Sequence, residues 1–138
     1  MQGLHLTADA TGCALEAPAM ADLGALRALC LAAVAAAGLH AVAELFHRFT
    51  QAEGGGGITG VVLLAESHLA VHTWPEIGAV TLDVYVCNFG ADNSSRAQAL
   101  IEALLAAFAP TAVDRQRLQR GRPHPPTSRP PSAQQSTS

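Results

Sequence analysis

Apolar and polar residues along this chain follow two periods, one of two residues and one of about 3.6 residues. Alternation is typical of a strand with one buried face, and the longer period is typical of an amphipathic helix. Five segments alternate or are apolar throughout, and they predict strands at residues 3–9, 42–50, 60–65, 79–87 and 112–118. Two segments with helical spacing predict helices at residues 21–37 and 93–109.

The second helix has the clearest pattern, because its apolar residues form one stripe between a cap at Asp92 or Asn93 and a stop at Pro110. The stripe consists of Ala97, Leu100, Ile101, Leu104, Leu105 and Phe108. Two amphipathic helices and a mainly antiparallel sheet predict an α+β fold, a two-layer α/β sandwich with both helices on one face. The other face carries a mixed set of side chains that is typical of a site or a subunit contact: Thr7, Asp9, Asp83, Tyr85 and Cys87.

The length of 138 residues predicts one domain, which we place at residues 1–120. Residues 121–138 contain five prolines, four serines and no large apolar residue. Because such a segment buries too little surface to offset its ordering entropy, we expect a disordered tail there.

Charge and cysteine content narrow the class of protein. The net charge is −3, and the arginines gathered after Asp114 have no aromatic residues among them, so we expect no nucleic acid partner. No apolar stretch is long enough to span a bilayer, so we expect no membrane segment. Three widely spaced cysteines without a CxxC pair favour a cytoplasmic location over a disulfide framework. The chain has no lysine, which excludes a Schiff base on a lysine amine.

The segment LLAESHLAVHTWPE, residues 63–76, concentrates chemically active side chains where a buried strand ends. Glu66, Ser67 and His68 follow that strand directly, and His72 comes four residues after His68. The two histidines do not fit the HExxH zinc motif, which needs a Glu after the first His and a helix beneath it. Ser67 lacks the flanking glycines of a hydrolase nucleophile elbow. We therefore expect no metal site and no conventional serine hydrolase.

Three other features carry weaker signals. The glycines at 54–57 are interpreted as a flexible hairpin connection, because no GKS/T pattern or helix follows them. Phe49 and Trp74, taken alone, are interpreted as core aromatics. Cys87 lies on the polar face of its strand by parity, which leaves open both an inert packing role and a functional thiol.

The motif AESHLAVHTWPE resembles the signature of the bacterial and archaeal S-adenosylmethionine decarboxylase proenzymes, which are pyruvoyl-dependent enzymes of polyamine synthesis. GLHLTADATGC is similar to the family's opening strand, LFHRFT to its His-x-Phe segment, ITGVVLLAESH to its approach to the cleavage site and VYVC to its catalytic cysteine strand. The resemblance covers residues 3–121. It implies decarboxylation of S-adenosylmethionine to supply aminopropyl groups for spermidine. The alternative is a pyruvoyl-dependent arginine or ornithine decarboxylase on the same scaffold.

The resemblance also implies how such a chain matures. In this family the bond between the Glu and the Ser of the motif, here Glu66 and Ser67, breaks itself. The Ser67 hydroxyl attacks the Glu66 carbonyl carbon, and Ser67 becomes a covalent pyruvoyl group that forms a Schiff base with the substrate amine. The products are a chain of residues 1–66 and a chain that starts at residue 67. Family members are dimers with sites near the subunit contact, which implies a homodimer of processed protomers.

Individual roles follow from position in the family motifs. His72 is expected to be the proton acceptor in processing, and Cys87 the proton donor in decarboxylation. Thr59 stands where the family usually has a serine, and its hydroxyl is expected to support processing. Phe49 and Glu76 are expected to bind the substrate.

An arginine or ornithine enzyme would instead need a carboxylate for the distal cation of its substrate. Glu44 or Asp83 could supply one.

Overall fold

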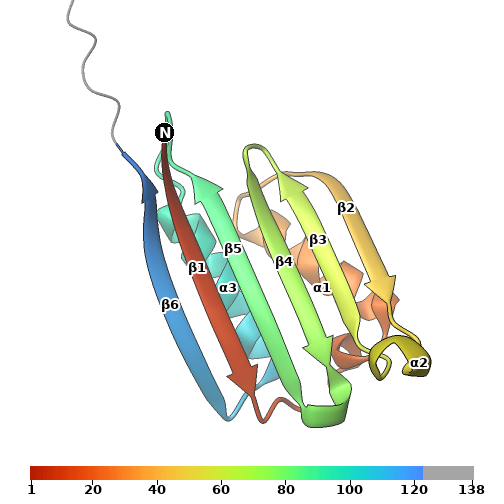
Figure 1. Cartoon of the computed structure of the whole chain (residues 1–138). Coiled ribbons are helices and arrows are strands. Elements are labelled where there is room, and N and C mark those ends of the chain that lie inside the picture. The colour runs from red at the N-terminus through yellow and green to blue at the C-terminus, as the bar shows by residue number, and fades with distance from the viewer. Residues whose placement is uncertain (123–138) are drawn as a thin grey trace, which may run out of the picture.

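Six strands form one antiparallel sheet in the computed structural model, which describes residues 1–122 (Figure 1). The strands are β1 (Gln2–Thr11), β2 (Ala41–Arg48), β3 (Ile58–Leu64), β4 (Ser67–Trp74), β5 (Ala79–Cys87) and β6 (Ala112–Gly121). Their order across the sheet is β2-β3-β4-β5-β1-β6, and every neighbouring pair is antiparallel.

Two long helices, α1 (Leu23–Ala36) and α3 (Ser94–Phe108), lie side by side on one face of this sheet (Figure 1). Three shorter elements lie in the connections: η1 (Pro18–Met20), α2 (Gln51–Gly54) and η2 (Pro75–Ile77). The predicted α+β two-layer sandwich with both helices on one face is therefore confirmed. None of the helices in residues 1–122 has the length and apolarity that a membrane span requires.

The core lies between the sheet and the two helices, and the pleat of the strands decides which side chains enter it. Successive residues of a strand point to opposite faces. In β5, Val80, Leu82, Val84 and Val86 are fully buried, and the residues between them are only half-buried. From the helix side, α3 buries the whole predicted stripe: Ala97, Leu100, Ile101, Leu104, Leu105 and Phe108.

Strands β4 and β6 differ most from the sequence prediction. Strand β4 was not predicted, although Leu69, Val71 and Thr73 alternate with half-buried neighbours and are themselves buried. This strand follows β3 after only two residues, and polar residues such as His68 and His72 stand between its buried ones. Strand β6 is longer than predicted and takes in Gly121, the first residue of the expected tail. Residues 123–138 of that tail lie outside the described residues.

The glycine run connects β2 to β3, as predicted, but its backbone is specific. Thr50 caps the short helix α2, and Gly55 and Gly56 then adopt φ values of 80° and 81°, where a side chain would be strained. A Cβ atom at Gly57 would stand 2.2 Å from the backbone oxygen of Thr73. These glycines allow the chain to turn tightly against the end of β4.

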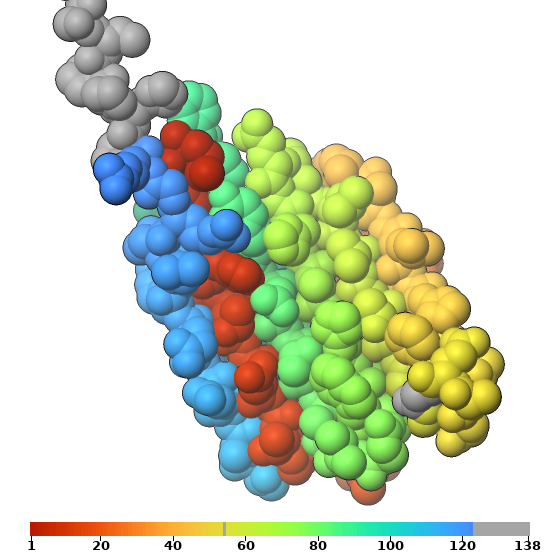
Figure 2. Space-filling view, viewed as in Figure 1, coloured from red at the N-terminus to blue at the C-terminus, as the bar shows by residue number. Residues whose placement is uncertain are grey.

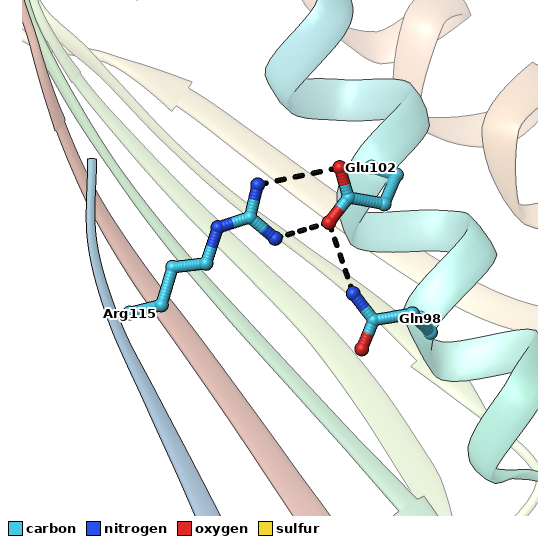
Figure 3. Close-up of polar contacts among 3 residues, drawn as sticks. All are labelled: Gln98, Glu102 and Arg115. Carbon is cyan, nitrogen blue, oxygen red and sulfur yellow. Dashed lines mark hydrogen bonds and ion pairs between the residues drawn. The ribbon is translucent and has the colours of Figure 1, made fainter. Parts of the chain in front are cut away.

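One edge of the sheet, β6, is joined to α3 by an ion pair (Figure 3). The guanidinium of Arg115 donates to both carboxylate oxygens of Glu102, and the amide of Gln98 donates to one of them at 2.9 Å. The bond from Arg115 lowers the pKa of Glu102. Because an exposed pair of this kind contributes only about 0–1 kcal/mol, the pairing of β6 with β1 is the main restraint on this edge.

The division between core and surface predicts different effects for one substitution at two positions. Leu104→Ala removes a fully buried side chain from α3 and should lower the free energy of unfolding by about 2–5 kcal/mol. Leu15→Ala, at a leucine that is 66% exposed, should change it by less than about 0.5 kcal/mol. Urea titrations followed by circular dichroism at one protein concentration would measure both. Equal effects would contradict the assignment of the core.

Candidate active site

The face of the sheet turned away from α1 and α3 is accessible, and Figure 2 shows it as a continuous surface formed by all six strands. We call it the open face. The pleat that buries Val84 and Val86 of β5 puts Asp83, Tyr85 and Cys87 on this face. The predicted position of these residues opposite the helices is therefore confirmed.

The turn between β3 and β4 consists of Ala65 and Glu66, and Leu64 and Ser67 pair on either side of it. Glu66 has a φ of 55°, in the left-handed region that glycine and asparagine favour and that most side chains avoid. A residue held in this region stores strain of about 1–3 kcal/mol. The strained residue, Glu66, thus contributes the carbonyl group of the peptide bond to Ser67.

Ser67 lies beside the end of β5. Its Oγ accepts a hydrogen bond of 3.0 Å from the backbone N–H of Cys87, and both residues are half-buried. This contact joins residues twenty positions apart, the serine at the start of β4 and the cysteine at the end of β5. A cavity of about 240 Å³ adjoins them and is lined by Met1, Glu66, Cys87 and Phe89. We call it the Cys87 cavity.

The three cysteines differ in their ability to exchange a proton. Cys13 and Cys30 are buried in the core. Burial raises the pKa of Cys13, and burial together with the charge of Glu44 raises the pKa of Cys30 to about 12. Cys87 is half-buried and faces a cavity, so it is the thiol that a ligand on the open face can reach.

His72 and Thr59 form a second polar pair, at the other end of β4. Thr59 Oγ1 and His72 Nδ1 are 2.9 Å apart, on paired positions of β3 and β4. The His72 ring stacks on Trp74 with a centroid distance of 5.9 Å and an interplanar angle of 30°. Trp74 is therefore on the open face, and its interpretation as a core aromatic was wrong.

Phe49 lies at this end too. It lines a cavity of about 200 Å³ with Glu53, Gly57, Ile58, Thr59, His72, Thr73 and Trp74. We call it the His72 cavity. Phe49 is half-buried at its rim, so the structure does not bear out a core role for it. Glu76, in η2, is exposed beside Gly55 of the neighbouring loop.

The structure thus divides the predicted site residues into two groups. Ser67, Glu66 and Cys87 come together at one end of the sheet, next to the N-terminus, and the residues of the His72 cavity lie at the opposite end, near α2 (Figure 1). Ser67 and His72 are five residues apart on one extended strand, which at about 3.3 Å per residue separates them by about 16 Å. Within one chain, His72 does not reach Ser67.

A cluster of titratable side chains extends along the open face from the Ser67 end of the sheet. His5 Nε2 is 3.0 Å from Asp83 Oδ1, and the rings of His68 and Tyr85 stack with centroids 5.7 Å apart. Partial burial lowers the pKa of His68, and the neighbouring His5 lowers it further, while Asp83 opposes both effects. This cluster supplies polar groups to the middle of the open face.

The two carboxylates considered for an arginine or ornithine substrate already have partners. Asp83 is bonded to His5, and Glu44 forms an ion pair with Arg27 of α1. Each carboxylate thus engages one oxygen, and the second Glu44 oxygen, Oε2, is buried without a hydrogen-bond partner among residues 1–122.

Sequence reasoning missed two residues of the Cys87 cavity, Met1 and Phe89. It predicted Asn93 only as a possible helix cap. The side-chain amide of Asn93 also donates a hydrogen bond of 2.8 Å to the backbone oxygen of Cys87. The sequence did contain a signal for Phe89. This large apolar residue lies two positions after Cys87 and next to Gly90, outside every predicted strand and helix, where burial in the core does not explain it. Met1 and Asn93 had no comparable signal.

Comparisons with known proteins show which family this chain is similar to. A family model described as S-adenosylmethionine decarboxylase matches residues 4–121. A proenzyme of that name from Aquifex aeolicus strain VF5 is 36% identical over 119 residues, which cover 86% of this chain and 81% of the relative. One from Pyrococcus furiosus is 36% identical over 107 residues, which cover 78% of this chain and 73% of the relative.

A solved structure agrees as well. The crystal structure of the adenosylmethionine decarboxylase from Aquifex aeolicus superposes with a TM-score of 0.78 at 33% identity, and the match covers 92% of this chain and 97% of that one. The resemblance found in the sequence motifs is confirmed over most of the chain. The protein belongs to the S-adenosylmethionine decarboxylase family.

Proposed function

We propose that this protein cleaves itself between Glu66 and Ser67 and then decarboxylates S-adenosylmethionine with a pyruvoyl group made from Ser67. The observation that carries the proposal is the contact between Ser67 Oγ and the N–H of Cys87, 3.0 Å long, directly after the strained Glu66. It joins the bond to be cleaved and a reachable thiol in one place. The names of the relatives, S-adenosylmethionine decarboxylase proenzymes, support the choice of reaction and substrate.

The residues present fit the formation of a pyruvoyl group. Ser67 follows a two-residue turn, and its hydroxyl oxygen accepts a hydrogen bond, which leaves its own proton free to be removed. Attack of that oxygen on the Glu66 carbonyl carbon converts the amide to an ester. Removal of the Ser67 α-proton then expels the Glu66 carboxylate and leaves a dehydroalanine. Hydrolysis with loss of ammonia turns this residue into the pyruvoyl group.

The conformation of Glu66 supports cleavage at this bond and not at a neighbouring one. Breaking the chain after Glu66 releases the strain of its positive φ, because a free carboxyl end is no longer held by the Leu64–Ser67 pair. About 1–3 kcal/mol of relief favours the cleaved chain over the intact one by roughly 5- to 160-fold. The turn therefore favours cleavage at this bond.

The pyruvoyl group supplies a ketone that condenses with the substrate amine and accepts the electrons released with carbon dioxide. A proton must afterwards return to the α-carbon, and we assign this transfer to Cys87 Sγ. The N–H of Cys87 is bonded to Ser67, and its carbonyl accepts a hydrogen bond from Asn93, so the backbone that carries the thiol is held beside residue 67. Cys13 and Cys30 are buried in the core, with raised pKa values.

A complete site needs a second copy of the chain. Removal of the Ser67 protons requires a base, and His72 of the same chain is about 16 Å away along β4. A two-fold axis near the middle of β4, with the open faces packed together, exchanges the two ends of the strand. Such a homodimer puts the His72 cavity of one protomer, with Thr59 and Phe49, opposite the Cys87 cavity of the other.

The open face also has apolar residues that a second copy would cover. Leu45 and Leu63 are 75% and 47% exposed and line a shallow cavity with Ala43 and Val61. Exposed apolar residues gathered in this way are typical of an interaction surface.

The alternative of an arginine or ornithine decarboxylase is not favoured. The relatives that match most of the chain are named for S-adenosylmethionine. Of the two candidate carboxylates, Asp83 pairs with His5 and Glu44 pairs with Arg27 of α1 through one oxygen each. An aromatic ring such as Phe49 at the rim of the His72 cavity suits an adenine base. The unpaired cysteines fit a reducing compartment, and we propose a cytoplasmic location.

Self-cleavage predicts two fragments in place of one chain. Purified protein should yield residues 1–66 and a fragment from residue 67 with a blocked terminus. Ser67→Ala should keep the full mass of 14.2 kDa, because no hydroxyl is left to attack Glu66. Intact-mass spectrometry would measure this, with Ser95→Ala, at an exposed serine of α3, as the control that still cleaves. A wild-type chain that stays whole after long incubation would contradict the proposal.

A site shared between two protomers predicts complementation. His72→Ala alone should cleave at least about tenfold more slowly, since it lacks the base, and Ser67→Ala alone should not cleave. In a mixed dimer, Ser67 of the first variant meets His72 of the second, so the His72→Ala chain should be cut. Co-expression with two different tags, followed by mass spectrometry of each chain, would test this. Isolated heterodimers without cleavage would show that one chain holds the whole site.

The role of Cys87 predicts a separation of processing from turnover. Cys87→Ser should still cleave, yet release carbon dioxide about a hundredfold more slowly, because a hydroxyl is a much weaker acid than a thiol. Cys30→Ala, at a thiol buried in the core, should leave turnover unchanged once the protein is folded. Trapping of labelled carbon dioxide would measure both. Normal turnover of Cys87→Ser would remove this residue from the mechanism.

A further inference from the structure

Cys87 lies just beyond the point where β4 and β5 pair. Their ladder ends with His68 and Tyr85, two residues before the thiol. Two side chains bond the Cys87 backbone there: Ser67 Oγ accepts a hydrogen bond of 3.0 Å from its N–H, and Asn93 Nδ2 donates one of 2.8 Å to its carbonyl oxygen. On this side, the residue that carries the thiol is therefore held by side chains and not by the sheet ladder.

Self-cleavage removes one of these two bonds. In the proposed reaction the bond between Ser67 Cβ and Oγ breaks, so the departing Glu66 carboxylate keeps the Oγ atom. The hydroxyl that accepted from the Cys87 N–H is thus lost from residue 67. Of the two side-chain bonds to Cys87, only the one from Asn93 remains in the cleaved protein.

The side chain of Asn93 is oriented for this bond by its other contacts. Arg96 donates a hydrogen bond of 2.6 Å to Asn93 Oδ1, so the amide nitrogen is the atom that faces the Cys87 carbonyl. The backbone N–H of Asn93 donates 2.8 Å to Asn88 Oδ1, and the N–H of Asn88 donates 2.9 Å to the backbone oxygen of Gln2. These bonds connect Asn93 to the end of β5 and to β1.

Asn93 does not have the role that its residue type and position favour. It stands at the N-cap of α3, where an asparagine side chain usually accepts a hydrogen bond from a backbone N–H of the first helical turn. The Asn93 side chain makes no such bond, and its amide donates back to the end of β5. Asp92 accepts from the N–H of Ser94 at this helix end. A cap residue that leaves its own helix uncapped indicates a different use for its amide.

We propose that Asn93 is a positioning residue, which keeps the Cys87 thiol directed at the substrate α-carbon once the Ser67 hydroxyl is gone. The proposal rests on the proposed function, in which Cys87 returns the proton after carbon dioxide has left. Asn93 acts through the backbone of Cys87, whose carbonyl it bonds, and not on the substrate itself.

The direction of the thiol matters because two carbons can receive the proton. Loss of carbon dioxide leaves an electron pair shared between the substrate α-carbon and the carbon of residue 67 that bears the nitrogen. A proton from Cys87 Sγ to the α-carbon, followed by addition of water, releases the amine product and restores the ketone. A proton to the residue-67 carbon, followed by addition of water, releases an aldehyde and leaves an amino-terminal alanine, which ends catalysis. In both cases solvent returns a proton to the thiolate.

Asn93→Asp tests this role, because a carboxylate can still accept from Arg96 but cannot donate to the Cys87 carbonyl. Mass spectrometry and Edman sequencing of the second chain during turnover would detect the alanine, since a pyruvoyl terminus is blocked. Alanine formed per turnover should rise by about two- to tenfold, the range expected for one hydrogen bond. Asn93→Ala should behave alike. Gln98→Glu, the corresponding change at an exposed amide of α3, should match wild type.

A second measurement needs no turnover. Ser67→Ala removes the hydroxyl without cleavage, so the bond from Asn93 is the remaining one of the two in an intact chain. Adding Asn93→Asp to this variant should speed hydrogen exchange at the Asn88 N–H, which is bonded to Gln2, by about two- to tenfold in NMR spectra. Adding Gln98→Glu in the same background should leave that exchange rate unchanged.

The outcomes separate this inference from the function on which it rests. Unchanged alanine per turnover in both Asn93 variants would overturn the inference, and so would an equal rise in Gln98→Glu. Slower turnover without more alanine would mean that Asn93 serves stability only and would overturn it as well. A wild-type protein that neither cleaves nor decarboxylates would refute the proposed function itself. In that case the exchange rate of the Asn88 N–H would still decide whether Asn93 holds this end of β5.

Discussion

The pleat of β4 is the constraint on which the candidate site depends. Leu69, Val71 and Thr73 are buried against the helices, so the residues between them must face the other way. A slip of one residue in the register would put His72 into the core and leave apolar side chains on the surface. Packing of the core therefore turns His68 and His72 onto the open face. Ser67, at the start of the strand, is placed by the turn before it and by its bond to Cys87.

The end of the same strand combines a structural and a chemical role. A two-residue turn is the shortest way to join β3 and β4, and it holds Glu66 in a left-handed conformation that a glycine would adopt more easily. Such strain persists only where the surrounding pairs impose it, here the ladder that begins at Leu64 and Ser67. The sheet thus directs strain to the bond that the proposed reaction breaks.

The extended strands of the sheet also explain why the site residues are divided. An extended strand rises about 3.3 Å per residue, so side chains five positions apart on one strand cannot meet. An open face that carries polar groups at both ends and apolar groups beside them suits a second copy in the reverse direction. The proposed dimer follows from this geometry together with the exposed Leu45 and Leu63.

The sequence by itself determined the layer architecture and the family. The stripe of α3 and the alternation of β5 are local patterns, and the motif around Glu66 and Ser67 is a run of adjacent residues, so one chain sufficed to find them. Only the tertiary structure decided which of these residues meet. Contacts such as Ser67 with Cys87, and the distance from Ser67 to His72, depend on strand pairing across the sheet, which no local pattern encodes. The same holds for Phe89, because its place at the Cys87 cavity depends on bonds to Gln2 and Asn93 that come from other parts of the chain.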